Sequence, residues 1–485
     1  MNNAPVVTRF APSPTGYMHI GNLRTALYSY LIARHGNGKF VLRIEDTDRE
    51  RLVEGATDVI MRTLAVTGLT YDEGPGVGGE HGPYVQSERK SIYMEYAKKL
   101  VECGAAYYCF CTKERLGQLH EEDATGGYDR FCRNLSPEEV EKNLAEGKPF
   151  VIRQKMPLTG TTSYVDAVFG EISVENEELQ DQILMKADGY PTYNFAHVVD
   201  DYLMGITHVV RGSEYLTSTP KYVLLYDAFG WERPTYVHLP LLMGKNADGT
   251  VSKLSKRHGA VSFEDLVKDG YLPEAIVNYI ALLGWCPKGD NAENEFFTLK
   301  ELENTFSIEG VNKSPSVFDF DKLLWFNGEY IKKLDFESFC KLATPFLKTP
   351  LPADVDAVAV LRLLQGRIGK LSEIEEKCAF FRALPEYEPT LFENKKNKVT
   401  LPLAKDVLVA VLPTLNDCTV WNNDALYEAL LTVSEKLGCK SGAVMWCARI
   451  AVSGMAVTPG GATEIMAAVG KEESLRRLQI ALDKL

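Results

Sequence analysis

The amino-terminal segment carries the pattern that most restricts the fold of this chain. Residues 6–10 form a short β-prone run, and the APSPTG run at residues 11–16 can continue neither a strand nor a helix. Apolar side chains then recur at helical spacing over residues 23–31, Gly36 supplies a helix stop, and residues 40–44 form a second β-prone run. We therefore predict a strand–helix–strand unit, the building block of a doubly wound parallel sheet, which binds ligands where its strands end.

The character of the chain changes twice after this unit. Residues 57–69 and 88–103 favour helices, the pattern becomes irregular through Gly126 and Gly127, and residues 186–199 again resemble β-structure. We expect an insertion in this middle third. From about residue 336, amphipathic helices follow one another between proline or glycine turns, which predicts a separate all-α domain.

Composition narrows the class of protein. The 485 residues are 45% hydrophobic and 25% charged, which suits a soluble, globular chain of about three domains. The formal net charge of −13 argues against a binder of nucleic acid that works by charge alone. The start has neither a basic leader nor an apolar core, and no apolar stretch approaches about 20 residues, so neither a secretory signal nor a membrane span is expected. Most of the ten cysteines lie scattered among apolar neighbours, which is typical of reduced thiols in a cytoplasmic protein.

The loop at residues 12–22, between the first strand and the first helix, contains Gly16, His19 and Gly21. Unpaired backbone N–H groups and the helix dipole favour a phosphate at such a place. The glycines permit close backbone approach, and His19 could donate to a phosphate oxygen or to a developing negative charge. A tight turn without any ligand explains the same residues about equally well.

A second polar loop, KLSKR at residues 253–257, follows a glycine-flanked stretch at residues 244–249. Clustered cations on a mobile loop could hold a leaving polyphosphate and offset the charge that builds up in a transition state. A basic pentapeptide by itself is most often a solvated surface loop. Its occurrence together with the first loop favours phosphate chemistry.

These loops resemble the signatures of one family. RFAPSPTGYMHIGN at residues 9–22 is similar to the "HIGH" signature of class I aminoacyl-tRNA synthetases in its glutamyl form, and KLSKR is similar to the "KMSKS" loop of that class. RIEDTD (43–48), DGYPTY (188–193), VDDYLMG (199–205), RGSE (211–214) and WFNGEYI (325–331) resemble bacterial-type glutamyl-tRNA synthetases in order and spacing. Asn22, Leu254 and Arg257 depart from the class-wide patterns in ways usual for this branch.

The resemblance, which covers essentially the whole chain, implies a domain order. A Rossmann-like catalytic domain would occupy residues 1–85 and 195–250, with an inserted α+β acceptor-binding domain at 86–194. A connecting region that contacts the tRNA stem and carries the KLSKR loop would occupy residues 251–332, and an all-α anticodon-binding domain residues 333–485. The implied partners are L-glutamate, ATP, tRNA(Glu) and conceivably tRNA(Gln), bound by a cytoplasmic monomer.

The implied activity forms glutamyl-adenylate and diphosphate, and then moves the glutamyl group to the terminal ribose of the tRNA. A carboxylate that attacks the α-phosphate needs no protein nucleophile, so positioning and cations are the expected equipment, with Mg²⁺ carried by ATP. By resemblance the catalytic residues are His19, Gly21, Lys253, Ser255 and Lys256. The ATP-binding residues are Pro12, Thr15, Gly16, His19, Gly21, Asn22 and Lys256.

Glutamate has two carboxylates and one ammonium group, and the planar fork of arginine suits a carboxylate. By resemblance the glutamate-binding residues are Arg9, Ala11, Ser13, Glu45, Tyr193 and Arg211, with the arginines and Tyr193 at the side-chain carboxylate and with Ser13 and Glu45 at the α-amino end. A salt-bridged strand end is the plainer alternative for Glu45, and a core role is the plainer alternative for Tyr193.

Cys109, Cys111 and Cys132 form the one cluster of cysteines worth testing for a metal. Three thiolates with a fourth donor could hold a tetrahedral structural Zn²⁺, although a C-x₂-C pair is the better attested spacing. One family variant has a histidine two residues past the last cysteine where this chain has Asn134, so Tyr128, His120 or water would have to complete the site. Three reduced thiols without a metal explain the cluster equally well.

In the carboxyl-terminal half, Arg367 resembles the arginine that contacts the third anticodon base in members specific for the glutamate tRNA, and a surface arginine is the alternative.

Three rival functions remain. A glutaminyl enzyme is disfavoured because that group usually ends in β-barrels. A shortened tRNA-modifying glutamyl transferase is disfavoured by the length of the chain, and an RNA-binding paralogue without catalysis by the presence of His19 and Lys256.

Overall fold

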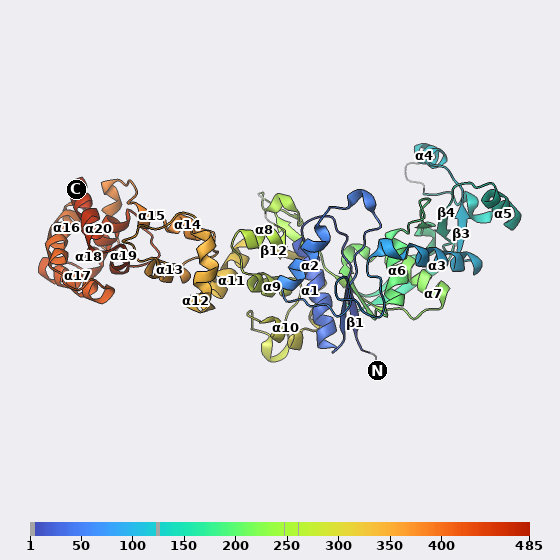
Figure 1. The fold of residues 1–485 in the computed structure, drawn as a ribbon, viewed down its shortest axis with the longest axis horizontal. Helices are drawn as coiled ribbons and strands as arrows, with labels where there is room; N and C mark the ends of the chain where they lie inside the picture. The colour runs from blue at the N-terminus through green and yellow to red at the C-terminus, as the bar shows by residue number, and fades with distance from the viewer. Residues whose placement is uncertain (1–4, 123–126, 247, 260) are drawn as a thin grey trace. The chain divides into compact units, whose positions relative to one another are not determined.

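The fold is that of a computed structural model, which describes residues 5–122, 127–246, 248–259 and 261–485 without the side chains of His120, Glu122, Lys256 and Asp290. The chain divides into two compact units (Figure 1). The first comprises Met1–Leu266 and Ile276–Asp319, and the second comprises Val267–Ala275 and Phe320–Leu485. Each unit is described by itself.

A six-stranded sheet forms the centre of the first unit, with the strands in the order β2–β1–β8–β9–β5–β6. Their bounds are β1 Val7–Phe10, β2 Lys39–Leu42, β5 Thr161–Asp166, β6 Gly170–Glu175, β8 His208–Gly212 and β9 Thr235–Leu239. Neighbouring strands pair in parallel except for β6, which is antiparallel to β5. The expected doubly wound parallel sheet is confirmed, and its edge strand β6 makes it mixed.

Helix α1 (Ile20–His35) connects β1 to β2, as the sequence predicts. It is buried on almost every side, with Leu23 and Leu27 fully enclosed, as expected of a helix that other elements cover. After the helix the chain passes so close to β1 that a Cβ on Gly38 would meet the carbonyl oxygen of Val6 at 1.7 Å. Only glycine fits there, and the close approach sets the parallel pairing of β2 with β1.

Further helices surround the sheets of the first unit (Figure 1). They are α2 Ala56–Val66, α3 Lys90–Glu102, α4 Lys113–Glu122, α5 Pro137–Ala145, α6 Tyr193–Leu203, α7 Thr219–Phe229 and α10 Leu299–Thr305, while α8 Phe263–Lys268 and α9 Pro273–Ala281 share residues with both units. Helices α3, α6 and α7 share a core that includes the fully buried rings of Tyr93, Phe195 and Tyr222. The same core also includes Leu184 and Met185, which precede α6 in the sequence.

Residues 86–194, the segment expected to form an insertion, contribute to two different sheets. Strands β3 (Ala106–Cys109), β4 (Val151–Gln154) and β7 (Ile183–Met185) form a small antiparallel sheet. Strands β5 and β6 instead extend the main sheet, because β5 pairs in parallel with β9. The strict alternation of exposed and buried residues along β5 fits a strand with one face on the core and one in solvent.

A third sheet, in the order β11–β10–β12, carries the second signature loop. Its strands are β10 Leu242–Lys245, β11 Val251–Lys253 and β12 Ser316–Phe318. Strands β10 and β11 form an antiparallel hairpin in which Met243 pairs with Lys253. The KLSKR residues therefore begin on the last residue of a strand and continue as a loop.

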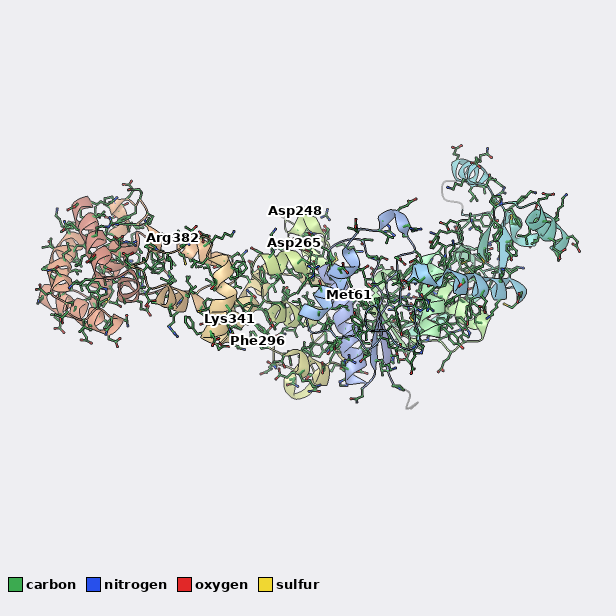
Figure 2. All side chains as sticks on the ribbon, in the orientation of Figure 1. Met61, Asp248, Asp265, Phe296, Lys341 and Arg382 are labelled. Atoms are coloured by element: carbon green, nitrogen blue, oxygen red, sulfur yellow. The ribbon has the colours of Figure 1, made fainter. Side chains whose placement is uncertain are left out.

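The second unit is built from helices, which confirms the expected helical domain. They are α11 Phe320–Lys333, α12 Phe336–Ala343, α13 Ala357–Gln365, α14 Glu373–Lys377, α15 Ala379–Arg382, α16 Leu401–Asn416, α17 Asn423–Leu437, α18 Ser441–Ser453, α19 Ala462–Val469 and α20 Lys471–Lys484. Arg382, the last residue of α15, is labelled in Figure 2. Its side chain donates to the Thr349 carbonyl and to the carboxylate of Glu375, the latter at 3.0 Å, and so connects α15 to residue 349 and to α14. Within the described residues, no helix has the length and apolar character that crossing a membrane would require.

Candidate active site

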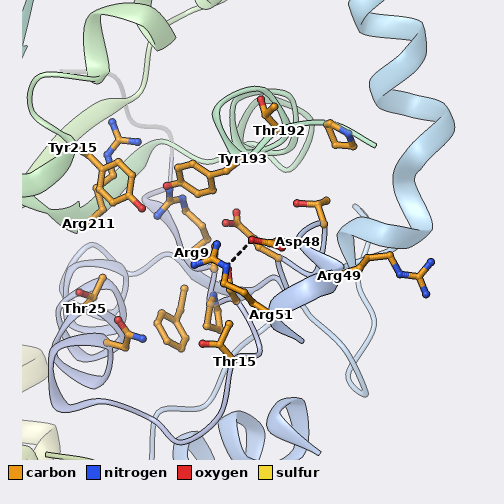
Figure 3. A pocket seen from close by; sticks show the side chains of 18 of the residues that line it. Arg9, Thr15, Thr25, Asp48, Arg49, Arg51, Thr192, Tyr193, Arg211 and Tyr215 are labelled. Atoms are coloured by element: carbon orange, nitrogen blue, oxygen red, sulfur yellow. Dashed lines mark hydrogen bonds and ion pairs between the residues drawn. The ribbon is translucent and has the colours of Figure 1, made fainter. Parts of the chain in front are cut away.

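A cavity of about 970 Å³ opens at the carboxyl ends of β1 and β8 (Figure 3). These two strands are neighbours, and the chain continues from β1 to one side of the sheet and from β8 to the other. The cavity therefore lies at the point where the strand order reverses, which is the usual ligand position in a doubly wound sheet.

Arg9 reaches the cavity from β1 and is almost completely buried. Its Nε donates to Oδ1 of Asp201 at 3.1 Å, and its Nη1 donates to the carbonyl oxygen of Val210 at 3.1 Å. These two bonds fix the plane of the guanidinium and leave Nη2 for a ligand. A rigid cationic fork in this setting suits a carboxylate.

Arg211 reaches the same cavity from β8, and only 5% of its surface is exposed. Its Nε donates to Nε2 of His238 at 3.1 Å and its Nη2 to Oγ1 of Thr219 at 2.7 Å. Its Nη1 is buried and has no hydrogen-bond partner within the described part of the chain. Three rings, those of Tyr215, Tyr222 and Tyr236, lie 4.8–5.6 Å from its guanidinium carbon. An unsatisfied buried donor of this kind favours a ligand that accepts a hydrogen bond.

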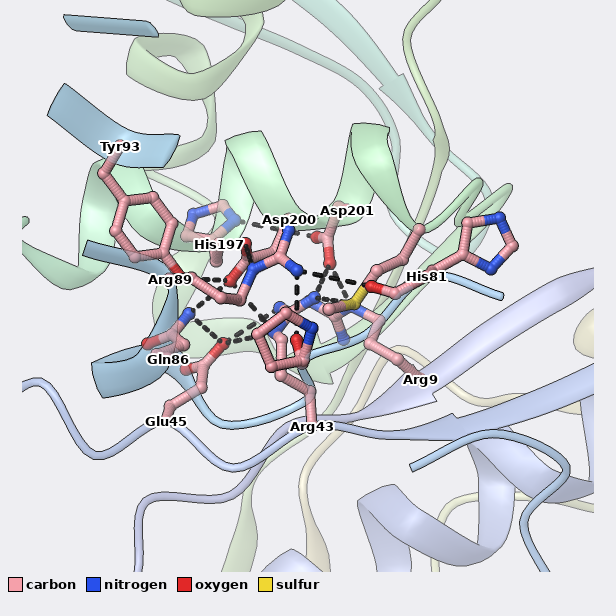
Figure 4. A network of polar contacts seen from close by, with 12 residues as sticks. Arg9, Arg43, Glu45, His81, Gln86, Arg89, Tyr93, His197, Asp200 and Asp201 are labelled. Carbon is pink, nitrogen blue, oxygen red and sulfur yellow. Dashed lines mark hydrogen bonds and ion pairs between the residues drawn. The ribbon is translucent and has the colours of Figure 1, made fainter. Parts of the chain in front are cut away.

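Arg43 lies beneath the cavity at the centre of a network of ion pairs (Figure 4). It is fully buried and lies 2.9 Å from Glu45, 2.8 Å from Asp201 and 3.6 Å from Asp200. Burial would raise the pKa of Asp201, but the charges of Arg9 and Arg43 hold it well below its usual range. Burial raises the pKa of Glu45, and Arg43 opposes that rise. Glu45 also lines the cavity, so its carboxylate is held where a ligand can meet it.

Asp200 is the second acidic centre of this network. It accepts from Nε of Arg89 at 2.7 Å, from Nε2 of Gln86 at 2.9 Å and from the hydroxyl of Tyr93 at 2.8 Å (Figure 4). All of these side chains are buried, and an unpaired charge among them would be strongly destabilising. The two adjacent aspartates of α6 thus join the helix to all three arginines of the network, Arg9, Arg43 and Arg89.

Tyr193 lines the cavity at the first residue of α6. Its ring centroid lies 4.9 Å from that of His197 and 5.5 Å from that of Tyr215. Burial raises the pKa of Tyr193 well above its ordinary value, so the hydroxyl stays protonated and able to donate. Burial lowers the pKa of His197 to about 4, which keeps that imidazole neutral at pH 7.

The first signature loop ends in a histidine cap. His19 is the N-cap of α1, and its Nδ1 accepts from the N–H of Gly21 at 3.0 Å. An accepting Nδ1 places the proton of a neutral imidazole on Nε2, which is then a donor. Gly16 has a φ of +130°, in the region that favours glycine. The loop therefore offers a glycine turn and a helix amino terminus next to a histidine donor, the setting expected for a phosphate.

The second signature loop is anchored through its buried leucine. The N–H of Leu254 donates to the carbonyl of Leu242 at 2.9 Å, and the N–H of Ser255 donates to Nδ1 of His258 at 3.1 Å. Lys253 is exposed at the end of β11. The side chain of Lys256 lies outside the described residues.

The segment that follows the second signature loop pairs with the first signature loop. The N–H of Ile20 donates to the carbonyl of Val261, and the N–H of Phe263 donates to the carbonyl of Met18, both at 2.9 Å. His19 lies between these two bonds and forms a bridge with Ser262. The first motif and the segment that follows the second motif, more than 200 residues apart in the sequence, thus share a short antiparallel contact.

The cavity gathers many of the residues expected from the sequence. Those that line it are Arg9, Ala11, Pro12, Ser13, Thr15, Asn22, Glu45, Tyr193 and Arg211. Those that are not part of its lining are Gly16, His19, Gly21, Lys253 and Ser255. The cavity thus contains all the expected glutamate-binding residues and part of the first signature loop, while Lys253 and Ser255 of the second loop lie outside its lining.

Sequence reasoning missed the cations that also line this cavity. They are Arg49, Arg51 and Lys186, of which Arg51 pairs with Asp48 at 2.6 Å (Figure 3). Arg49 and Arg51 directly follow the RIEDTD motif, so their proximity to it could have been noticed. Lys186 lies two residues before the DGYPTY motif, so its proximity to that motif could have been noticed as well.

The three cysteines of the predicted metal cluster do come together. Their sulfur atoms all lie within 4.8 Å of one another. The Sγ atoms of Cys111 and Cys132 are 3.6 Å apart, and the hydroxyl of Tyr128 lies 3.2 Å from Sγ of Cys109 and 3.7 Å from Sγ of Cys111. The side chain of His120, the other protein candidate for a fourth ligand, lies outside the described residues.

Arg367 lies in the turn after α13 and is exposed. Its N–H donates to the carbonyl of Leu364 at 2.8 Å, which fixes the backbone of the turn. Its side chain is therefore accessible to a partner, as it would also be on any polar surface.

Two family models match the chain. The model described as "tRNA synthetases class I (E and Q), catalytic domain" matches residues 5–325, and the model described as "Anticodon binding domain" matches residues 338–482. The second match covers most of the helical unit. It agrees with a full-length synthetase rather than with a shortened relative.

Individual relatives agree with these models. The glutamate–tRNA ligase of Clostridium novyi (strain NT) is 56% identical, with 100% of this chain and 99% of that protein covered. That of Clostridium tetani (strain Massachusetts / E88) is 54% identical, with the same coverage. The crystal structure of a glutamate tRNA ligase from Elizabethkingia meningosepticum, in complex with its amino acid, matches with a TM-score of 0.88 and 34% identity over 99% of this chain and 100% of that chain. The chain belongs to the glutamate–tRNA ligase family of class I aminoacyl-tRNA synthetases.

Proposed function

We propose that this protein activates L-glutamate with ATP and transfers it to the 3′ end of tRNA(Glu) for protein synthesis. The observation that carries the proposal is the pair of buried arginines, Arg9 and Arg211, held rigidly in one cavity beside Glu45. The two guanidinium groups suit the side-chain carboxylate of glutamate, and the carboxylate of Glu45 suits its ammonium group. A glutamine side chain offers a neutral amide and suits these arginines less well.

The proposed glutamate site assigns one role to each group. Arg9, Arg211 and the protonated hydroxyl of Tyr193 bind the side-chain carboxylate. Ser13 and Glu45 bind the α-amino group, with the backbone at Ala11 along one side. The pairing of Glu45 with Arg43 supports its role, because it favours the ionised carboxylate that an ammonium group needs.

The proposed ATP site lies around the first signature loop. Its residues are Pro12, Thr15, Gly16, His19, Gly21, Asn22 and Lys256. The amino terminus of α1 and the Nε2 proton of His19 would face the phosphates, and Gly16 and Gly21 would allow close approach. Mg²⁺ would enter as part of the ATP substrate and offset phosphate charge.

The chemical step needs positioning and charge rather than a nucleophile from the protein. The α-carboxylate of glutamate attacks the α-phosphate of ATP, and diphosphate leaves. His19 and Lys253 with Lys256 would stabilise the charge that develops on the phosphates, while Gly21 and Ser255 keep the two loops in shape. The paired backbone of residues 18–20 and 261–263 supports joint action of the loops.

The proposed tRNA contacts divide between the predicted regions. Residues 86–194 would bind the acceptor end, residues 251–332 the stem and residues 333–485 the anticodon, with Arg367 reading one base edge. The same geometry would accommodate tRNA(Gln) if the anticodon contacts tolerate it. From the family resemblance we also propose that the enzyme is a monomer and acts in the cytoplasm.

We also propose a structural Zn²⁺ held by Cys109, Cys111, Cys132 and Tyr128. A tetrahedral zinc with Zn–S bonds of about 2.3 Å separates its sulfur ligands by about 3.8 Å. The 3.6 Å between Cys111 and Cys132 fits this spacing, as do the distances to the Tyr128 hydroxyl. The hydrogen bonds from Cys132 and Tyr128 lower the pKa of Cys109 to about 4, which favours a thiolate there, while the bond to Cys109 raises the pKa of Cys132, whose proton a metal would have to displace.

The experiment that tests the activity is ATP–diphosphate exchange with glutamate, in the presence of cognate tRNA. We expect exchange that depends on both glutamate and tRNA and that glutamine does not support. Folded protein that shows no exchange with tRNA present would exclude the proposed reaction.

A further inference from the structure

A buried pair of residues lies behind Arg211 and outside the glutamate-contacting set. His238, on β9, and Asp166, at the end of β5, are both completely enclosed. Nδ1 of His238 lies 2.6 Å from Oδ2 of Asp166, and Nε2 of His238 accepts from Nε of Arg211 at 3.1 Å. The three side chains thus form a chain of contacts from β5 across β9 to Arg211 on β8, which lines the cavity.

The hydrogen bonds define the state of the imidazole. A nitrogen that accepts from an arginine carries no proton, so Nε2 is bare and Nδ1 holds the proton that it donates to Asp166. A protonated ring would turn a second donor toward Arg211 and break the contact. Burial also lowers the pKa of His238, in agreement with a neutral ring.

Asp166 is anchored independently of the histidine ring. Its Oδ1 accepts from the N–H groups of Val168 and Phe169 at 3.0 and 2.8 Å, and its Oδ2 also accepts from the N–H of His238 at 3.1 Å. These bonds to the backbone hold the carboxylate at the end of β5. The ring of His238 therefore has a fixed partner on one side and Arg211 on the other.

The arrangement orients Arg211 without supplying a counter-charge. His238 and Thr219 take Nε and Nη2, so Nη1 is the nitrogen left for the cavity, and it is buried without a partner among the described residues. None of the ion pairs of the described residues includes Arg211, whereas Arg43 has carboxylates on three sides. A carboxylate in direct contact would neutralise the guanidinium. A neutral imidazole in that place holds it and leaves its charge for a ligand.

We propose that His238, backed by Asp166, is a positioning residue that aims Nη1 of Arg211 at the side-chain carboxylate of glutamate. The inference rests on the proposed function, in which Arg211 binds that carboxylate. The pair contributes to the preference for glutamate over glutamine, because a charged and oriented donor gains more from a carboxylate than from an amide. Its effect should appear in the binding of glutamate rather than in that of ATP.

Two substitutions separate positioning from packing. His238→Gln can place an amide oxygen where Nε2 lies and so keeps an acceptor for Arg211. His238→Asn is shorter and keeps a donor for Asp166 but loses the acceptor. Tyr164→Phe is the matched control, because Tyr164 lies on the same strand as Asp166, with its ring 6.4 Å from that of His238, and its hydroxyl donates to the Leu216 carbonyl rather than to His238 or Asp166.

Exchange kinetics with glutamate, glutamine and ATP provide the readout, alongside the melting temperature of each variant. We expect His238→Asn to raise the KM for glutamate by about tenfold or more and to narrow the preference for glutamate over glutamine, with the KM for ATP little changed. His238→Gln should recover most of the loss, and Tyr164→Phe should match the unmodified protein. A folded His238→Asn variant with an unchanged KM for glutamate would overturn the proposal, as would an equal loss in both His238 variants.

The unmodified protein supplies a measurement that does not depend on the folding of variants. Nitrogen-15 NMR of labelled histidine should show a neutral His238 with its proton on Nδ1, and a proton on Nε2 would overturn the proposal. If the unmodified enzyme shows no glutamate-dependent exchange, the proposed function itself fails. Active unmodified enzyme with an insensitive His238→Asn variant refutes the positioning role alone.

Discussion

Buried arginines in this protein serve two purposes, and their partners separate them. Arg43 is surrounded by Glu45, Asp200 and Asp201, so its charge is compensated within the fold. Arg211 has neutral partners and keeps its charge for a ligand. Arg9 lies between these cases, since it shares Asp201 with Arg43 and still borders the cavity. The binding site is thus built on top of a structural network.

Asp201→Asn tests that network. The variant removes the charge that Arg9 and Arg43 share, and breaking a buried pair costs about 3–5 kcal/mol. We expect a clear fall in the melting temperature together with a rise of about tenfold or more in the KM for glutamate, because Arg9 loses its orientation. Thermal unfolding and exchange kinetics measure the two effects.

Asp227→Asn is the matched control for this variant. Asp227 pairs with Arg233 at 2.6 Å, but both side chains are more than 40% exposed, so the pair contributes about 0–1 kcal/mol. Equal changes in stability for the two variants would contradict the role of Asp201.

The residues of the site were predictable from the sequence to the extent that short motifs contain them. Arg9, Glu45 and Arg211 each lie within a motif, so their types and spacing identified them as candidates. His238 and Asp166 lie 72 residues apart and outside every motif. Their contact depends on the pairing of β5 with β9, which no local sequence pattern predicts.

At the scale of elements, two loops from distant parts of the chain act beside one another. The His19 loop begins α1, and residues 261–263, which follow the KLSKR loop, pair with residues 18–20. This pairing gives the cations of the second loop a fixed base near the proposed phosphate site.

Lys256→Ala tests the role of the second loop. We expect it to slow adenylate formation by about 100-fold or more, because a cation that stabilises developing phosphate charge acts mainly in the transition state. Affinity for tRNA should change much less. Lys245→Ala, an exposed lysine at the end of β10, should leave both nearly unchanged. Equal losses of adenylate formation and of tRNA affinity in Lys256→Ala would refute the assigned role.

The cysteine cluster makes a separate prediction for the small sheet that contains β3. Purified protein should contain about one zinc per chain, and Cys132→Ser should lose it and become less stable. Cys103→Ser is the control, because Cys103 is an exposed cysteine outside the cluster and should leave the metal content unchanged. No zinc after purification without chelators would favour three reduced thiols instead.

The elements themselves were only partly predictable. The βαβ unit and the helical domain follow from periodicity, which is a local property of the sequence. The division of residues 86–194 between two sheets does not follow from periodicity. The alternating pattern of β5 predicts a half-buried strand, but it does not indicate which strand β5 pairs with. The pairing of β5 with β9 determines that β5 and β6 belong to the main sheet.

At the scale of the whole molecule, a net charge of −13 coexists with a proposed polyanionic substrate. Association with tRNA depends on the local field rather than on the total charge, and the cavity is bordered by Arg49, Arg51 and Lys186. An acidic protein with local basic faces would bind RNA through shape and unpaired bases more than through bulk attraction. Acidic surface elsewhere would then favour release.

The most direct test of the central claim is aminoacylation of purified tRNA(Glu) and tRNA(Gln) with labelled glutamate and, separately, with labelled glutamine. We predict ATP-dependent transfer of glutamate to tRNA(Glu) and no transfer of glutamine to either tRNA. Transfer of glutamate to tRNA(Gln) as well would broaden the specificity without changing the reaction. Folded protein that attaches no glutamate to tRNA(Glu), or that prefers glutamine, would contradict the account.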